Sequence, residues 1–196
     1  MKIIVAKNIG FCSGVQRAIL TAEKSLAEDP RPVQLLGSLV HNEKVIEKLT
    51  KKGIKFRTSL NAVKSGALII QAHGFPPFYK KINEKILIRD ATCPLVKKVQ
   101  LIAGYLYKSG YKVIIIADRK HSETKGIKGY TNKKGPINEN AEQAKKLPKF
   151  KKIGVVAQTT QNSDNVDRVL GILKTKTKKL KYFDTLCPEV QARQKE

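Results

Sequence analysis

Long apolar runs are scarce in this sequence of 196 residues, so the protein classes that require them are not expected. No stretch approaches the roughly 20 apolar residues that a membrane-spanning helix needs. The chain opens with MKIIVAKN, and this apolar run is too short for the core of a secretory signal peptide. We therefore expect a soluble, cytoplasmic protein without a membrane partner.

Cysteine is also scarce. The three cysteines are Cys12, Cys93 and Cys187, whose positions differ by 81 and 94. Cytoplasmic proteins rarely rely on disulfides, so these cysteines do not predict a disulfide framework. Their separation is far from any short metal-ligand motif, and spacing alone therefore predicts no metal site.

Arginine and acidic residues are few compared with lysine. Of the 39 basic residues 7 are arginine, and with 16 acidic residues the net charge is +23. This charge is compatible with an anionic ligand, but base-edge recognition of nucleic acid usually relies on arginine. Much of the lysine lies in mixed runs such as KKLPKFKK (145–152) and KTKTKKLK (174–181), which are typical of a solvated surface. A nucleic-acid partner is therefore not expected.

Short β-rich apolar runs alternate with amphipathic helical patterns along the chain. Such runs suit strands buried on both faces of a sheet. They are KIIVA (2–6), VQLLG (33–37), ALIIQA (67–72), KILIRD (85–90), KVIIIA (112–117), IGVVAQ (153–158) and LKYFD (180–184). The helical patterns cover residues 14–28, 95–110 and 165–175, with Gly110 as a stop signal and Ser163 or Asp164 as an N-cap. The alternation predicts the α/β class with mainly parallel sheets.

Every cysteine and every histidine follows one of these strand-like runs. The histidines are His41, His73 and His121, and the pair Thr159–Thr160 takes the same kind of position. In open parallel α/β sheets, ligands bind outside the carboxyl ends of the strands. The coincidence predicts a functional site that is built from several of these residues.

Two metal centres are compatible with these residue types. Zinc usually takes four ligands, and three thiolates with one histidine would supply them. Three thiolates can also hold a [4Fe–4S] cluster and leave one iron open to a substrate atom. Glu123, two residues after His121, can serve as a proton donor or as a first-turn acid that complements a helix dipole.

The sequence resembles the 4-hydroxy-3-methylbut-2-enyl diphosphate reductase family, also called LytB. The stretches that carry the resemblance run in the family's order and cover nearly the whole chain. They are GFCSGVQRAI around Cys12, LVHNEKVIEKL around His41, AHG at His73, DATCPLVKKV around Cys93, HSETKGIKG around His121 and Glu123, AQTT ending at Thr160, and TLCPEVQARQ around Cys187.

The resemblance implies a role for each matched position. The three cysteines would ligate one [4Fe–4S] cluster whose remaining iron binds the substrate's hydroxyl. His41 and His73 would bind the diphosphate, His121 would help to hold the substrate, and Glu123 would deliver protons. Thr159 would hydrogen-bond near the substrate alcohol, with Thr160 as the alternative in register. The reaction would be a two-electron reductive dehydroxylation that gives isopentenyl and dimethylallyl diphosphate. A ferredoxin or flavodoxin-type protein would donate the electrons.

The resemblance also implies three similar lobes in a pseudo-threefold arrangement. We expect complete α/β lobes at residues 14–93 and 94–186, and a remnant of a third lobe formed by residues 1–13 with 187–196. Family members continue beyond the position that matches the last residue, so a truncated, inactive or subunit-dependent member is the first alternative. A zinc-dependent α/β enzyme and a basic nucleic-acid-binding protein are further alternatives, which metal analysis and the salt dependence of binding would separate.

Overall fold

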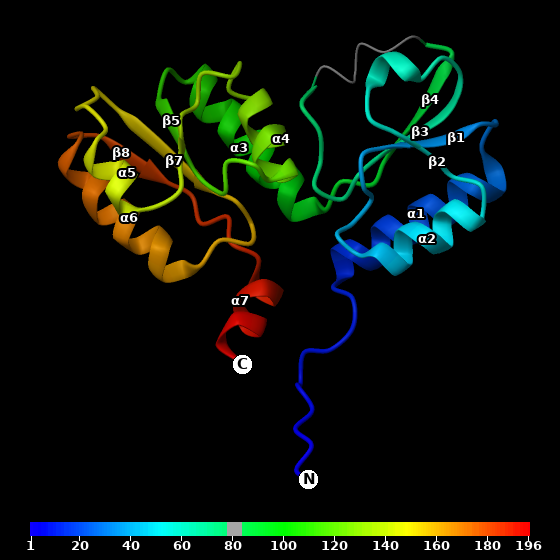
Figure 1. Cartoon of the computed structure of the whole chain (residues 1–196). Coiled ribbons are helices and arrows are strands. Elements are labelled where there is room, and N and C mark those ends of the chain that lie inside the picture. The colour runs from blue at the N-terminus through cyan, green and yellow to red at the C-terminus, as the bar shows by residue number, and fades with distance from the viewer. Residues whose placement is uncertain (78–83) are drawn as a thin grey trace. The chain divides into compact units, whose positions relative to one another are not determined.

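The computed structural model describes residues 1–77 and 84–196, which form two compact units. The first unit is Ser13–Lys97, and the second joins Met1–Cys12 to Lys98–Glu196. Each unit is built on a four-stranded sheet in which every strand pair is parallel (Figure 1). The α/β class with parallel sheets is therefore confirmed.

The sheet of the first unit has the strand order β2-β1-β3-β4. Its strands are β1 (Val33–Leu36), β2 (Lys55–Arg57), β3 (Gly66–Ile70) and β4 (Ile86–Asp90), and its helices are α1 (Ser13–Glu28), α2 (Glu43–Lys51) and the 3-10 turn η1 (Leu60–Ala62). Leu35 and Ile69 pack on one face of the sheet in a cluster that includes Ala18 of α1. Leu36 and Ile70 belong to a separate cluster. The two inner strands are thus buried on both faces, which explains their continuous apolar sequence.

The sheet of the second unit has the order β6-β5-β7-β8. Its strands are β5 (Lys112–Ile116), β6 (Ile137–Asn138), β7 (Ile153–Ala157) and β8 (Leu180–Tyr182). The helices are α3 (Pro94–Lys108), which begins before the unit boundary, α4 (Ser122–Gly129), α5 (Ala141–Lys145), α6 (Ser163–Thr175) and α7 (Pro188–Lys195). One face of the sheet packs with residues of α5 and α6, and the other with residues of α3 and α4 (Figure 1).

The two sheets share one topology. In each, the strand that comes first in sequence is second in the sheet, with the next strand on one side and the later two on the other. By this order β1 corresponds to β5, β3 to β7 and β4 to β8. The correspondence allows loops that leave equivalent strands to be compared residue by residue.

Three sequence-based expectations are wrong in detail. Residues 2–6 form no strand, because no strand in the described residues pairs with them. The edge strands β2 and β6 were not anticipated, since they are short and lie partly in solvent. Helix α6 is capped by Asn162, whose side chain accepts a hydrogen bond from the Asn165 backbone, and not by Ser163 or Asp164. Gly110 does follow the end of α3, in a left-handed conformation with φ of 75°.

Within the described part of the chain, no helix has the length and apolarity that a membrane span requires.

Candidate functional site

In the second unit, three of the predicted site residues meet at the carboxyl ends of β5 and β7. His121 is the N-cap of α4, and its Nδ1 accepts a hydrogen bond from the Glu123 backbone at 3.2 Å. Glu123 Oε1 accepts from the Thr159 backbone N–H at 2.8 Å, and the Thr159 hydroxyl lies 2.9 Å from Glu123 Oε2. The loop after β5 is thereby tied to the loop after β7 through one carboxyl group.

Glu123 is buried, with only 1% of its surface exposed. Burial disfavours the charged carboxylate, and it raises the pKa of Glu123 to about 7 even though the two hydrogen bonds from Thr159 act in the opposite direction. Coulombic repulsion from Asp118 adds to the rise. A carboxyl group in this state holds a proton close to neutral pH and can release it, which is the property that a general acid needs.

A side-chain network fixes the loop that carries Glu123. Gln158 Oε1 accepts hydrogen bonds from the Asp118 backbone at 3.0 Å and from the Thr124 hydroxyl at 3.3 Å. Gln161 Nε2 in turn donates to Asp118 Oδ1 at 3.1 Å. Sequence reasoning missed these three supporting groups, although Gln158 and Gln161 flank the threonine pair in AQTTQ and Asp118 directly follows the β5 run.

The two threonines of this loop have different surroundings. Thr159 is buried and contacts Glu123, whereas Thr160 is exposed and accepts a hydrogen bond from Gln158 Nε2 at 2.7 Å. Thr159 hydrogen-bonds to the carboxyl group through its backbone N–H and its hydroxyl, so it is the better placed of the two to influence proton transfer.

Cys93 and Cys187 are held in the same way in the two units. The Cys93 N–H donates to the Ala72 carbonyl at 2.9 Å, and the Cys187 N–H donates to the Thr159 carbonyl at 2.8 Å. Ala72 and Thr159 each lie two residues beyond the end of β3 and β7, respectively. Cys93 follows β4 and is bonded to the loop after the neighbouring strand β3, and Cys187 follows β8 and is bonded to the loop after β7. The two cysteines therefore have equivalent positions in the two sheets.

The cysteines also share a position relative to the helices. Cys12, Cys93 and Cys187 each stand one residue before the first residue of a helix, namely α1, α3 and α7. None of the three forms a disulfide, and all three are half-buried. A helix N-terminus stabilises negative charge, which favours the thiolate form that ligates metals. Each cysteine therefore has a position that suits a thiolate ligand.

In the first unit, His41 and His73 lie side by side. They leave the adjacent strands β1 and β3, and their ring centroids are 4.3 Å apart with the planes tilted by 34°. His73 is followed by Gly74, whose φ of 72° lies in the left-handed region that side chains disfavour and whose N–H donates to the Gln71 carbonyl at 2.9 Å. Two imidazole rings that follow adjacent strands can each donate an N–H to a single anion.

Residues around Cys93 form a support that the sequence did not reveal. The Thr92 N–H donates to Asp90 Oδ1 at 3.0 Å, in a turn that an Asp-x-Thr sequence can adopt. Asp90 also pairs with Lys97, with 2.8 Å between Oδ2 and Nζ. Hydrogen bonds from Lys97 and Thr92 outweigh the effect of burial and lower the pKa of Asp90. The carboxylate thus fixes both ends of the turn that presents Cys93.

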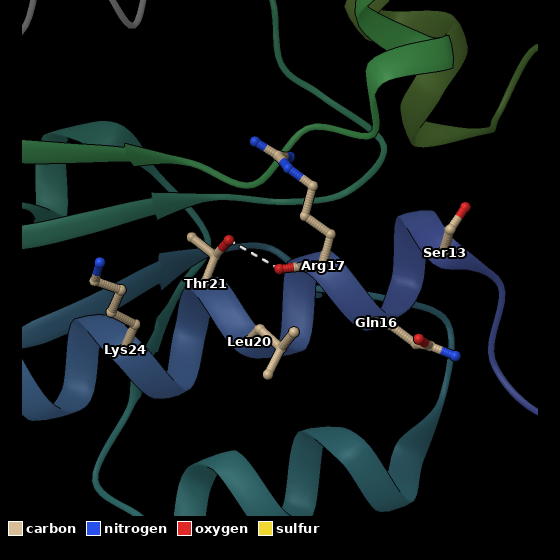
Figure 2. Close-up of a pocket in the computed structure, with 6 residues that line it drawn as sticks. All are labelled: Ser13, Gln16, Arg17, Leu20, Thr21 and Lys24. Carbon is tan, nitrogen blue, oxygen red and sulfur yellow. Dashed lines mark hydrogen bonds between the residues drawn. The ribbon is translucent and has the colours of Figure 1, made fainter.

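Helix α1 contributes to the same turn through Arg17, whose guanidinium donates to the Thr92 carbonyl at 2.9 Å. Figure 2 shows Arg17 extending from the helix, beside the Thr21 hydroxyl that bonds to the Arg17 carbonyl at 2.8 Å. A shallow hollow lies along this helix, and it contains none of the predicted site residues. Its lining is Ser13, Gln16, Arg17, Leu20, Thr21 and Lys24.

Comparisons with known proteins identify the family of this chain. The model of the LytB protein family matches residues 3–196. A curated 4-hydroxy-3-methylbut-2-enyl diphosphate reductase of Dictyoglomus thermophilum is 45% identical over 198 residues, which cover 99% of this chain and 69% of that protein. The reductase of Dictyoglomus turgidum is 46% identical with the same coverage.

Two solved structures are similar as well. The E-1-hydroxy-2-methyl-but-2-enyl-4-diphosphate reductase from Plasmodium falciparum superposes with a TM-score of 0.88 at 35% identity, over 95% of this chain and 61% of its own. A second structure, titled (E)-4-hydroxy-3-methyl-but-2-enyl diphosphate reductase, the terminal enzyme of the non-mevalonate pathway, gives a TM-score of 0.85 at 35% identity, over 98% of this chain and 70% of its own. The chain thus spans between about three fifths and seven tenths of the length of these relatives.

Proposed function

This chain belongs to the LytB family of 4-hydroxy-3-methylbut-2-enyl diphosphate reductases, and from that premise we propose that it serves the two-electron reductive dehydroxylation of this diphosphate. The carbon–oxygen bond of the allylic alcohol breaks, two electrons and two protons are taken up, and water leaves. The products are isopentenyl diphosphate and dimethylallyl diphosphate. The function is that of an oxidoreductase of isoprenoid biosynthesis.

The observation that carries the proposal is the buried acid Glu123. The hydroxyl of the substrate leaves as water, so a proton must reach its oxygen as the bond breaks. Glu123 keeps a proton near neutral pH because burial raises its pKa to about 7, and Thr159 holds both of its oxygens in place. We assign Glu123 as the proton donor and Thr159 as the residue that orients the donor and the substrate alcohol.

The histidines are assigned to the substrate. His41 and His73 bind the diphosphate, since their paired rings offer nitrogen donors to phosphate oxygens. His121 Nδ1 accepts the Glu123 N–H, so the proton of the neutral ring resides on Nε2. His121 can therefore donate to the substrate through Nε2 while it caps α4.

The proposed cofactor is one [4Fe–4S] cluster on Cys12, Cys93 and Cys187. What supports this fit is that the three half-buried cysteines form no disulfide and each directly precedes a helix. When bound, such a cluster supplies the electrons and an iron position for the substrate oxygen. Electrons reach it from a donor protein of the ferredoxin or flavodoxin type. The reducing chemistry and the free thiols suit the cytoplasm, which is the compartment that we propose.

The domain division also remains a proposal. We propose that residues 14–93 and 94–186 are two lobes, and that residues 1–13 with 187–196 are the remnant of an incomplete third lobe. Two features support this. Helix α7 has no buried residue, and the apolar side chains of Ile3, Ile4 and Val5 lie in solvent. Both features distinguish these segments from helices of the two lobes such as α1 and α6, which have buried residues.

Anaerobic reconstitution with iron and sulfide tests the cofactor. We expect about four iron atoms per chain with a broad visible absorption, and loss of both in Cys93→Ser. Thr92→Ser, beside the cysteine, is the matched control and should keep both signals. Zinc in place of iron, or equal absorption by Cys93→Ser and the control, would contradict the proposal.

A further inference from the structure

The strongest charged feature of the molecule lies away from the proposed active site. Twelve lysines fall in residues 108–112, 145–152 and 174–181, and these segments contain no acidic residue. They lead from the ends of α3, α5 and α6 to the strands β5, β7 and β8. We call these three segments the basic edge, because they lie at the amino ends of the parallel strands of the second sheet.

Hydrogen bonds show that the three segments are adjacent. The Lys112 N–H donates to the Lys152 carbonyl at 3.0 Å, which joins the first segment to the second. The Phe150 N–H donates to the Lys176 carbonyl at 2.8 Å, which joins the second to the third. Lysines that are far apart in sequence therefore form one continuous surface.

Little within the described residues neutralises this surface. One ion pair is found there, between Lys145 and Glu142 at 2.8 Å. Two ammonium groups are used at helix ends, where Lys152 donates to the Ser109 carbonyl and Lys176 to the Lys145 carbonyl. Capping of helix C-termini requires only a few cations, so it leaves most of the charge unexplained. An uncompensated cluster of this size attracts polyanions.

Aromatic rings are interleaved with the lysines, although the sequence shows no such stripe. Lys152 Nζ lies 4.8 Å from the centre of the Tyr111 ring, and Lys181 Nζ lies 5.3 Å from that of Tyr105. Tyr105 is 54% exposed, which leaves part of its ring open to a stacking partner. Within the three segments no large aliphatic side chain is exposed, whereas Leu101, four residues before Tyr105 on α3, is 60% exposed.

We propose that the basic edge binds single-stranded nucleic acid, mainly through its phosphates and without sequence preference. Lysine acts as a point charge on phosphate, and the absence of arginine from the three segments removes the fork that reads base edges. A positively charged surface beside an exposed aromatic ring, here that of Tyr105, is a usual combination for binding single strands.

This activity is separate from the reductase site. Glu123, Thr159 and Cys187 follow the carboxyl ends of the strands, whereas the basic edge lies at their amino ends. A five-residue strand spans about 16 Å, so the basic edge and the loop that carries Glu123 lie at opposite ends of the same sheet. The inference therefore does not depend on the proposed reaction.

Fluorescence anisotropy with a labelled uridine oligomer of about 20 nucleotides tests the proposal on the full chain. The variant Lys149→Gln/Lys151→Gln/Lys178→Gln changes three exposed lysines that form no ion pair within the described residues. We expect the variant to bind the oligomer about tenfold or more weakly near 0.1 M salt. The slope of log affinity against log salt should become smaller by about 2, because each of the three lost phosphate contacts contributes ~0.7.

The matched control is Lys44→Gln/Lys55→Gln/Lys64→Gln, which removes the same charge from exposed positions of the first unit. It should bind within about twofold of the unchanged chain. Equal weakening by the two triple variants would mean that net charge alone attracts the oligomer, and would overturn the proposal. Tighter binding to phosphatidylserine vesicles than to the oligomer would assign the surface to a membrane and would also overturn it.

Discussion

The two sheets carry the same short motif at the same place, but its acid is exposed in one unit and buried in the other. His41 and His121 both stand five residues beyond the end of the equivalent strands β1 and β5, and each is followed two residues later by a glutamate. Glu43 is exposed, whereas Glu123 is buried. The same three-residue spacing therefore gives a surface acid in one unit and a buried acid in the other.

The difference arises where the helix begins. In the first unit Asn42 is the N-cap, so Glu43 is the first residue of α2. In the second unit His121 is itself the N-cap, so Glu123 is the second residue of α4. A shift of one residue turns a side chain by about 100° around the helix axis. The histidine that caps its own helix thus rotates the following acid from solvent into the interior.

The largest expected effect is on turnover, and it compares the two acids directly. Glu123→Gln keeps an oxygen for the Thr159 N–H and an N–H for the Thr159 hydroxyl, but it has no proton to transfer. We expect reductase turnover by the reconstituted chain to fall by about 100-fold or more, the usual contribution of a general acid. Glu43→Gln should leave turnover within about twofold. Equal turnover for the two variants would remove Glu123 from the reaction.

The next effect is on the pH dependence of stability. In the unfolded chain the Glu123 carboxyl titrates near its ordinary pKa of 4.5, whereas burial raises its pKa to about 7 in the folded chain. The folded state therefore binds more protons between these values, and the free energy of unfolding falls as pH rises from about 4.5 to 7. The loss is on the order of 3 kcal/mol.

Urea unfolding from pH 4.5 to 8 measures this loss, with Glu123→Gln and Glu43→Gln compared with the unchanged chain. The Glu123→Gln curve should lack the decline, because glutamine does not titrate in this range, and the Glu43→Gln curve should keep it. A decline that survives in Glu123→Gln would show that other groups cause it.

The inner strands of both sheets could be predicted from sequence because burial on both faces leaves a continuous apolar run. The same reasoning failed at residues 2–6, since an apolar run forms a strand only where another strand pairs with it. It also missed β2 and β6, which lie at sheet edges and carry polar residues such as Lys55 and Asn138. Edge position alone is not the reason, because the runs that form the opposite edge strands β4 and β8 were predicted; β2 and β6 have only three and two residues.

The site was partly predictable for a similar reason. The residue types and their places after strands could be read from the sequence, because parallel topology brings strand exits to one edge. The burial of Glu123 could not be read, since the HNE and HSE stretches differ only at the middle residue. The groups that hold the loops, such as Asp90 and Gln158, were missed because their role depends on contacts between segments.

A smaller effect is expected at Thr159, whose counterpart in the first unit is Ala72. Both carbonyls accept a hydrogen bond from a cysteine N–H, but only Thr159 adds a hydroxyl that contacts an acid. Thr159→Val keeps the shape and removes this hydrogen bond, at a cost of about 1–2 kcal/mol in unfolding free energy. The hydroxyl lowers the pKa of Glu123, so its loss should move the pH-dependent decline in stability to higher pH.

The control for this change is Thr160→Val, next along the chain. Thr160 is exposed, and its change should alter stability by no more than about 0.5 kcal/mol and leave the pH profile where it is. Unfolding curves at several pH values separate the two variants. If both moved the profile equally, the shift would report a general disturbance of the loop and not the lost hydrogen bond to Glu123.

The smallest effect tests the cause of the difference between the two units, which is the choice of helix cap. Asn42→Ala and His121→Ala each remove a side-chain acceptor from a first-turn N–H, of Val45 and Glu123 respectively, and each should cost about 1 kcal/mol of unfolding free energy. His121→Asn supplies a good cap and should recover most of that loss, as measured by urea unfolding. Full stability in His121→Ala would mean that the histidine ring does not set the start of α4, and the burial of Glu123 would then have to follow from its contacts with Thr159 alone.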